Sequence, residues 1–153
     1  MYGVGSMKFM RTMILAVTVL AAMAVTPHMS AGSDGGTAAG IQFGYPGNVG
    51  LSLRFDRIAV GAAWNFGDNG YLHITADYWL LKNKLAKNLD WYLGPGVNLG
   101  VGDPFALGVR LPIGLQWIPA EHIEIFGEAA PCLWLINAVD FDFNGAVGIR
   151  YIF

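Results

Sequence analysis

Apolar and polar residues alternate along most of the chain after residue 40. The closing stretch, residues 140–153, shows this most clearly, because Phe141 and Phe153 belong to one set while Asp142 and Arg150 belong to the other. A period of two with one apolar set is the signature of a β-strand. Aromatic residues gather at both ends of the apolar set, as in strands that cross a lipid bilayer with rings at each interface. The pattern therefore predicts a membrane-crossing strand.

The same alternation predicts eight strands in all, joined by short connections. Their expected ranges are 40–45, 49–55, 58–66, 72–80, 89–101, 105–117, 123–135 and 141–153. Asn69-Gly70 is a strong hairpin signal, because both residue types accept the positive φ angles that such a turn requires. Residues 82–88 form the longest expected polar connection. Short connections pair each strand antiparallel with its neighbour in the sequence.

A sheet edge cannot stay open in lipid, so the first strand is expected to pair with the last. The predicted fold is therefore all-β: an eight-stranded antiparallel up-and-down transmembrane β-barrel over residues 40–153. Pro95, Pro112 and Pro131 lie inside expected strands and cannot donate to the hydrogen-bond ladder. We expect a bulge or kink at each of them.

The two faces of the expected barrel differ in side-chain size. One face of nearly every strand is Leu, Ile, Val, Phe, Tyr or Trp, and the other is Gly, Ala and a few charged residues. A soluble eight-stranded barrel would place the apolar set inside, which would overfill a narrow interior. A continuous apolar band suits lipid better, so we favour the orientation with the apolar set outside.

The inner face then carries a network of charged and polar side chains. Its main members are expected to be Arg54, His73, Asp77, Arg110, Glu124, Glu128 and Arg150. An eight-stranded barrel is just wide enough to be filled by side chains. Buried charges must pair, because an unpaired one costs several kcal/mol. Adjacent strands at similar depth suggest Glu128 with Arg110, and Glu124 with Arg150, in a structural role.

The first thirty residues have a different composition, and all six Met residues lie among them. Lys8 and Arg11 precede an apolar run at 13–25, which small residues follow. This order predicts a secretory signal peptide over residues 1–31, with Met7 as an alternative start. The apolar run is too short for a spanning helix. Residues 32–39 are expected to be a flexible lead-in.

Composition and charge narrow the classes of partner. Hydrophobic residues make up 54% of the chain and charged residues only 13%, which is too apolar for an ordinary soluble domain. Removal of the signal peptide takes away two of nine basic residues and none of eleven acidic ones, leaving a net charge of −4. Nucleic acid is therefore not an expected partner. Cys132 is the only cysteine, so no internal disulfide can form.

Catalytic and metal chemistry find little support in the sequence. Lipid-modifying barrels need an activated nucleophile beside a His on the lipid side. The nearest pattern here, His73-Ile74-Thr75, points inward, and so does Ser52. His73, Asp77 and Cys132 lack metal-ligand spacing. No catalytic residue, cofactor or metal is therefore predicted.

Three stretches, 108–115, 123–131 and 141–153, resemble a family of small outer-membrane β-barrel proteins first noted in spirochaetes. That family is similar in architecture to outer membrane protein X and to the transmembrane domain of outer membrane protein A. His73-Ile74-Thr75-Ala76-Asp77-Tyr78 also fits the family's fourth strand, and the turn at Asp56-Arg57 is shorter than usual in it. The resemblance implies a bacterial outer-membrane location and no settled activity. Tyr151 and Phe153 look like the C-terminal signal that outer-membrane insertion machinery reads.

The expected role is structural or interactive, in a monomeric barrel with a side-chain-filled interior that contacts outer-membrane lipids. Two alternatives stay open: an enzyme that modifies lipid A, and a narrow, porin-like channel.

Overall fold

The computed structural model describes residues 36–67, 70–136 and 139–153, which belong to one compact unit, Gly32–Phe153. The expected signal peptide and the first residues of the lead-in lie outside the described residues. Within those ranges, no helix is long and apolar enough to span a lipid bilayer.

The described residues form eleven β-strands in one antiparallel sheet. The strands are β1 (Thr37–Tyr45), β2 (Val49–Phe55), β3 (Ile58–Trp64), β4 (Leu72–Tyr78), β5 (Leu81–Ala86), β6 (Leu89–Leu93), β7 (Gly96–Val101), β8 (Ala106–Arg110), β9 (Ile113–Ala120), β10 (Ile123–Trp134) and β11 (Asp140–Ile152).

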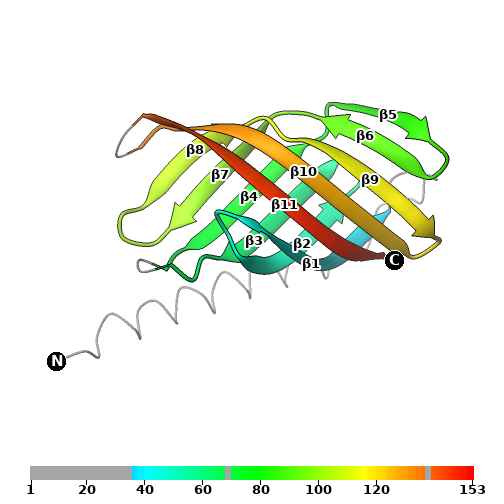
Figure 1. Cartoon of the computed structure of the whole chain (residues 1–153), viewed down its shortest axis with the longest axis horizontal. Helices are drawn as coiled ribbons and strands as arrows, with labels where there is room; N and C mark the ends of the chain where they lie inside the picture. Colours follow the sequence, from blue (N-terminus) through cyan, green and yellow to red (C-terminus); the bar gives the residue numbers. More distant parts are fainter. Residues whose placement is uncertain (1–35, 68–69, 137–138) are drawn as a thin grey trace. The chain divides into compact units, whose positions relative to one another are not determined.

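Eight of these strands close into a ring, in the order β11-β1-β2-β3-β4-β7-β8-β10, and β10 pairs back onto β11 (Figure 1). The predicted pairing of the first strand with the last is confirmed. It runs from Ala38 opposite Ile152 to Tyr45 opposite Gly145. The remaining strands, β9, β6 and β5, extend the sheet from the N-terminal half of β10, where Ile123–Ala129 pair with β9.

The ring is staggered. Starting at Leu133 on β10 and stepping through the paired residues of each neighbour leads once around the ring to Tyr151, and then back to β10 at Ile123. The path therefore returns ten residues from its start. Such a stagger accompanies strands tilted by roughly 35–45° to the ring axis. It also brings residues that are distant in sequence to the same depth inside the ring.

Two of the predicted strands, 89–101 and 105–117, are each divided into two. Gly94-Pro95 separates β6 from β7, and Leu111-Pro112 separates β8 from β9. Trp79-Leu80 separates β4 from β5, which lies beyond the predicted fourth strand. The expected break is thus found at Pro95 and at Pro112. The expectation for Pro131 is wrong, because this residue lies inside the uninterrupted strand β10.

The hydrogen bonds of the three prolines explain why the sheet breaks at Pro95 and Pro112 but not at Pro131. The prolines lie on successive strands of the sheet, and each faces the next strand. Each has no N–H to donate, but each carbonyl still accepts a bond from the neighbouring strand: Pro131 from Leu111 N at 3.0 Å, Pro112 from Gly94 N at 3.3 Å, and Pro95 from Tyr78 N at 2.9 Å. In an antiparallel strand the N–H and C=O of one residue face the same neighbour. The missing donor of Pro131 therefore faces the existing break at Leu111-Pro112, and β10 keeps its bonds to β11.

A bulge accompanies the break near Pro95. Asp77 pairs with Gly96, whereas Leu81 pairs with Leu93. Three residues, 78–80, therefore lie opposite only two, 94–95. The pairing of β8 and β9 with β10 continues without such a shift across Pro112.

Two expectations about connections are wrong. Residues 37–39, assigned to the lead-in, already belong to β1, because they pair with both β2 and β11. The polar segment 82–88 is mostly strand: β5 and β6 form a hairpin whose turn is only Lys87-Asn88. Asn88 has a φ of 59°, which Asn tolerates in tight turns.

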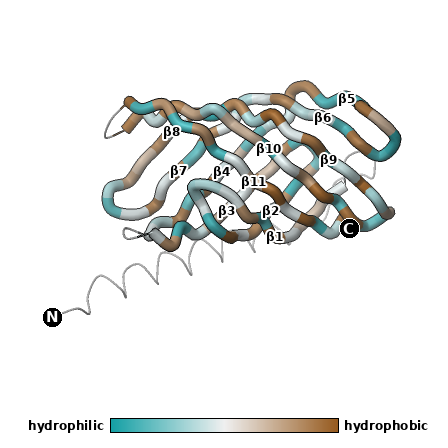
Figure 2. The backbone as a smooth tube through the Cα atoms, viewed as in Figure 1, coloured by the Kyte–Doolittle hydropathy of each residue, from teal (hydrophilic) through white to brown (hydrophobic). Residues whose placement is uncertain are grey.

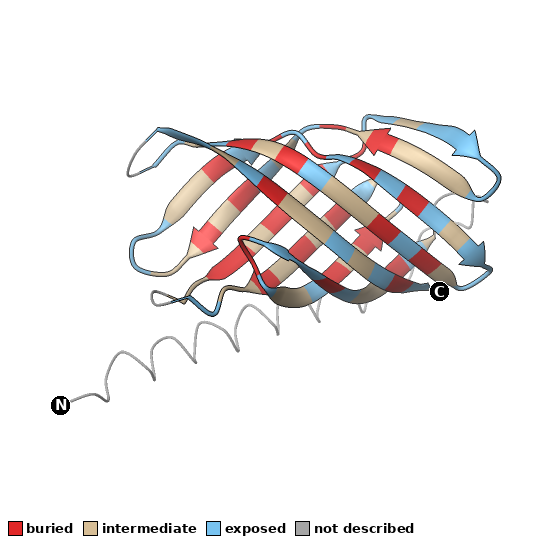
Figure 3. Cartoon of the chain, viewed as in Figure 1, coloured by how far each residue is buried: buried red, intermediate tan, exposed pale blue. Residues whose placement is uncertain are grey.

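The faces of the ring are arranged as expected, with large apolar side chains outside and charged ones inside. Hydrophobic and hydrophilic residues alternate along the strands (Figure 2), and exposed and buried residues alternate with them (Figure 3). Phe143 and Val147 are each 60% exposed, while Arg54 and Arg150 are each 2% exposed. This distribution is the reverse of that in a soluble protein.

Candidate functional site: the charged interior

The interior is organised around two groups of charged side chains. The first, which we call the terminal cluster, lies near the start of β1 and the end of β11 and consists of Ser52, Arg54, Glu124 and Arg150. Both oxygens of the Glu124 carboxylate are occupied. Oε2 faces Nη2 of Arg54 at 2.6 Å and Nε of Arg54 at 2.7 Å, and Oε1 faces Nη1 of Arg150 at 2.5 Å. Glu124 thus holds two guanidinium groups together: Oε2 accepts from two nitrogens of Arg54, and Oε1 accepts from Arg150.

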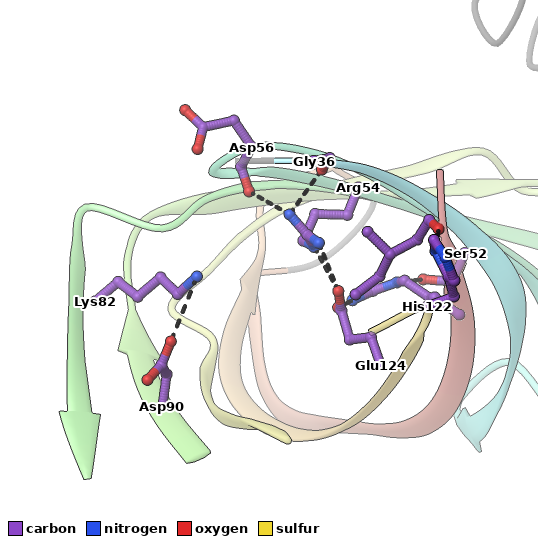
Figure 4. Close-up of polar contacts among 10 residues, drawn as sticks. Gly36, Ser52, Arg54, Asp56, Lys82, Asp90, His122 and Glu124 are labelled. Carbon is purple, nitrogen blue, oxygen red and sulfur yellow. Dashed lines mark hydrogen bonds and ion pairs between the residues drawn. The ribbon is translucent and has the colours of Figure 1, made fainter. Parts of the chain in front are cut away.

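Both arginines make further hydrogen bonds. Arg54 Nη1 donates to the carbonyls of Gly36 at 2.9 Å and Asp56 at 3.1 Å (Figure 4). Arg150 Nε donates to Ser52 Oγ at 2.9 Å. The guanidinium carbon of Arg150 also lies 3.6 Å from the centre of the Phe126 ring, a cation–π contact. The terminal cluster therefore connects β2, β10 and β11 with the start of β1.

The second group, the central cluster, consists of Asp77, Tyr92, Arg110 and Glu128. Arg110 Nη2 bonds to Glu128 Oε1, and Tyr92 Oη donates to Glu128 Oε2 at 2.9 Å. Arg110 Nε lies 3.1 Å from Asp77 Oδ1, which makes an ion pair but not a well-aligned hydrogen bond. The cluster joins four strands that the chain visits separately: β4, β6, β8 and β10.

An aromatic pair lies beside the two clusters. Trp79 and Tyr92 are fully buried and stack with ring centroids 3.9 Å apart and planes inclined by 14°. Arg54 lies 6.0 Å from the Trp79 ring, and Tyr92 belongs to the central cluster. Space for the Tyr92 ring depends on Gly114, since a Cβ at that residue would lie 2.3 Å from Tyr92 Cζ.

The charges of the two clusters complement each other. The terminal cluster holds two guanidinium groups and one carboxylate, and the central cluster holds one guanidinium group and two carboxylates. With all groups ionised, one positive and one negative excess cancel inside the ring. This balance matters because a buried net charge is far more costly than a paired one.

The opposite part of the interior is polar but less completely bonded. His73 is buried, its Nε2 has no hydrogen-bond partner among the described residues, and its ring lies 6.2 Å from that of Trp134. Both amide atoms of Asn98 are likewise unpartnered there. A cavity of about 20 Å³ adjoins this region, lined by Gln42, Gly44, Tyr45, Gly47, Ala63, His73, Thr75, Arg110, Glu128, Gly145 and Ala146. A cavity of this size holds about one water molecule.

The sequence placed seven residues in an interior polar network, and six of them lie in the two clusters. Both expected pairs, Arg110 with Glu128 and Arg150 with Glu124, are present. His73 is inside the ring but belongs to neither cluster. The sequence did not single out Trp79. It is the one large aromatic residue that its strand places on the inner face, and that contrast was a usable signal.

The residues considered for catalysis are buried inside the ring or bonded to other side chains. The Ser52 hydroxyl accepts a hydrogen bond from Arg150, and Thr75 is buried inside the ring. Cys132 is buried, with its Sγ 3.3 Å from Asn144 Oδ1. In the part of the chain that the structure describes, no group of three or more His, Cys, Asp or Glu residues is arranged to hold a metal ion.

Comparison with protein families, curated proteins and solved structures finds no match to the chain.

Proposed function

We propose that the chain is an integral β-barrel of the bacterial outer membrane with a structural or interaction role. One observation carries this proposal: a closed ring of strands exposes its large apolar side chains and buries its charged ones. In water, such a surface would be a severe liability. In lipid, it is the expected surface, and closure of the ring gives each of its eight strands a partner on both sides.

Most of the exposed aromatic residues gather in two belts, which supports a membrane location. One belt lies near the start of β1 and the end of β11 and consists of Trp117, Tyr151 and Phe153; the other lies near the opposite end of the ring and consists of Tyr45, Phe105, Phe141 and Phe143. Phe43, which pairs with Val147, and Tyr78 lie between them. On β11 the belts are separated by the aliphatic residues Val147 and Ile149. For tilted strands, the spacing of the belts along β11 corresponds to roughly 20–30 Å, close to the apolar thickness that such barrels present.

The connections suggest an orientation. At the end where β1 begins and β11 ends, which we call the terminal end, the turns are 56–57, 87–88 and 121–122. At the other end, the loop end, the connections are the longer segments 46–48, 65–71, 102–105 and 135–139. Outer-membrane barrels have short periplasmic turns and longer external loops. The terminal end is therefore proposed to face the periplasm.

The filled interior favours a structural or interaction role over transport. The two clusters and the Trp79–Tyr92 stack occupy the ring where an open channel would have to pass. A narrow channel and a lipid A-modifying enzyme remain the alternatives. Among the described residues, we find neither an open path through the ring nor a nucleophile beside a His on the outer face. Tyr151 and Phe153, both exposed at the end of β11, are proposed as the signal for the insertion machinery.

Cell fractionation tests the proposal. The full chain, expressed in a Gram-negative host, is expected in the outer-membrane fraction and resistant to extraction with alkaline carbonate. A protein recovered in the soluble periplasmic or cytoplasmic fraction would reject the membrane location. Lipid A mass spectra from expressing and non-expressing cells test the enzyme alternative, which a new lipid A species would support.

A further inference from the structure

The β5–β6 hairpin extends beyond the ring at its terminal end (Figure 1). The ring neighbour of β4 is β3, which begins at Ile58, and the last backbone–backbone hydrogen bond between the two sides runs from Trp79 N to Arg57 O at 2.8 Å. The Arg57 side chain adds a bond to the Leu80 carbonyl at 3.2 Å. From Leu81 onward, β5 pairs only with β6 among the described residues. The other edge of β5 therefore presents backbone N–H and C=O groups without a strand partner.

This unpaired edge limits where the hairpin can lie. Backbone groups without partners are not tolerated in the hydrocarbon region, because water is absent there. If the ring spans a membrane as proposed above, the hairpin lies beyond the hydrocarbon, at the level of the lipid headgroups. The inference that follows rests on that proposed location.

The hairpin concentrates positive charge. Lys82, Lys84 and Lys87 lie within six residues of one another. Lys82 Nζ is 3.6 Å from Asp90 Oδ2 and lies 5.8 Å from the Trp79 ring, so its charge is already balanced (Figure 4). Lys84 and Lys87 are exposed and, within the described ranges, have no ion pair. Two ammonium groups are thus available at the tip.

Apolar side chains accompany these charges. Leu81 and Leu85 are exposed on the same strand as Lys84, and Leu80 is exposed where the hairpin leaves the ring. Leucines beside lysines at the edge of a bilayer allow aliphatic groups to reach acyl chains while the ammonium groups reach phosphates. The hairpin therefore matches an anionic lipid surface in both respects.

We propose that the β5–β6 hairpin binds the headgroups of anionic phospholipids in the leaflet at the terminal end, and that Lys84 and Lys87 contact their phosphates. This contact anchors the part of the sheet that the ring leaves unclosed. It also favours the orientation in which the lysines meet an anionic leaflet.

Native mass spectrometry of the refolded full chain tests this inference, with phosphatidylglycerol and phosphatidylcholine offered in equal amounts. The wild type is expected to retain phosphatidylglycerol preferentially. Affinity should fall about fivefold for each lysine removed in Lys84→Gln and Lys87→Gln. A Lys84→Arg/Lys87→Arg variant should keep the preference. Asp103→Asn/Asp140→Asn, which changes the charge by two units at the loop end, should keep it as well.

Equal retention of the two lipids by the wild type would overturn the inference, and so would an undiminished preference in the double glutamine variant. If that variant does not refold, a salt titration of the wild type replaces it: the preference must weaken as salt screens the charges, and an unchanged preference would overturn the inference. Resistance of the unheated protein to denaturation by detergent, measured on the same samples, reports the barrel separately. A folded barrel without lipid preference contradicts only the hairpin contact, whereas a wild type that is soluble without detergent contradicts the membrane location itself.

Discussion

Trp79 and Tyr92 stack inside the ring with centroids 3.9 Å apart, although Tyr92 lies on β6 and Trp79 belongs to the bulge at residues 78–80 between β4 and β5. The extra residue of the bulge lets Leu80 and Leu81 both face outward while Trp79 stays buried. Tyr92 is in turn bonded to Glu128. The stack therefore links the irregular part of the sheet to the buried charges.

Replacing Trp79 by Ala is expected to destabilise the protein by about 3–5 kcal/mol, because removal of a fully buried indole leaves a cavity beside Tyr92. Unfolding by urea in lipid vesicles, followed by intrinsic fluorescence, measures the change. Trp91→Ala provides a comparison on the neighbouring strand, since Trp91 is only partly buried. Equal losses in the two variants would show that the stack has no special role.

Gly114→Ala is expected to displace the Tyr92 ring, because the added methyl group would overlap it. Overpacking of this kind costs typically about 1–3 kcal/mol. Gly127→Ala is a matched control on β10, since the nearest atom to its added Cβ would be 3.6 Å away. Near-ultraviolet circular dichroism reports the stack, and an unchanged spectrum in Gly114→Ala would contradict the tight contact.

Glu124→Gln is expected to cost about 3–5 kcal/mol, because it leaves two buried guanidinium groups without a carboxylate. Glu121→Gln, in the exposed turn between β9 and β10, should change stability by no more than about 0.5 kcal/mol. Denaturant midpoints of the two variants give the comparison. A Glu124→Gln protein as stable as the Glu121→Gln protein would show that the terminal cluster does not depend on its carboxylate.

Arginine substitutions at two equally exposed positions distinguish lipid from water around the ring. Val147, between the aromatic belts on β11, and Leu85, on the β5–β6 hairpin, are each 60% exposed. In a membrane, Val147→Arg should cost about 2–4 kcal/mol, whereas Leu85→Arg should cost close to nothing. Around a soluble ring both changes would be mild, so similar unfolding free energies would argue against lipid at Val147.

The period-two pattern predicted which side of the sheet the residues of the eight ring strands face, and it predicted ion pairs between neighbouring strands. Glu124 with Arg150 and Glu128 with Arg110 follow from such neighbours. Arg54 was not assigned to Glu124, because β2 and β10 are separated by β1 and β11 in the ring. The contact between Arg54 and Glu124 depends on how the ring closes and on its stagger. Neither property can be inferred from the alternation of apolar and polar residues within one strand.

The pattern also failed where both faces of a strand meet water. Residues 81–86 form β5, yet Asn83 and Lys84 are both exposed, so no apolar set distinguishes one face from the other. The bulge at residues 78–80 was missed for a related reason, since Leu80 and Leu81 are both apolar and either could continue the outer set. Pro131 was misjudged because its missing donor faces a break that another strand supplies.

Quenching of tryptophan fluorescence by lipids brominated on their acyl chains shows whether the outer face of the ring contacts lipid. Two single-tryptophan proteins are compared, with the other tryptophans replaced by Phe: one retains Trp117, which is 47% exposed on the outer face, and the other retains Trp79, which is fully buried inside. A transmembrane barrel with an apolar exterior predicts strong quenching of Trp117 and little of Trp79. Absence of quenching at Trp117, or stronger quenching at Trp79, would contradict the account.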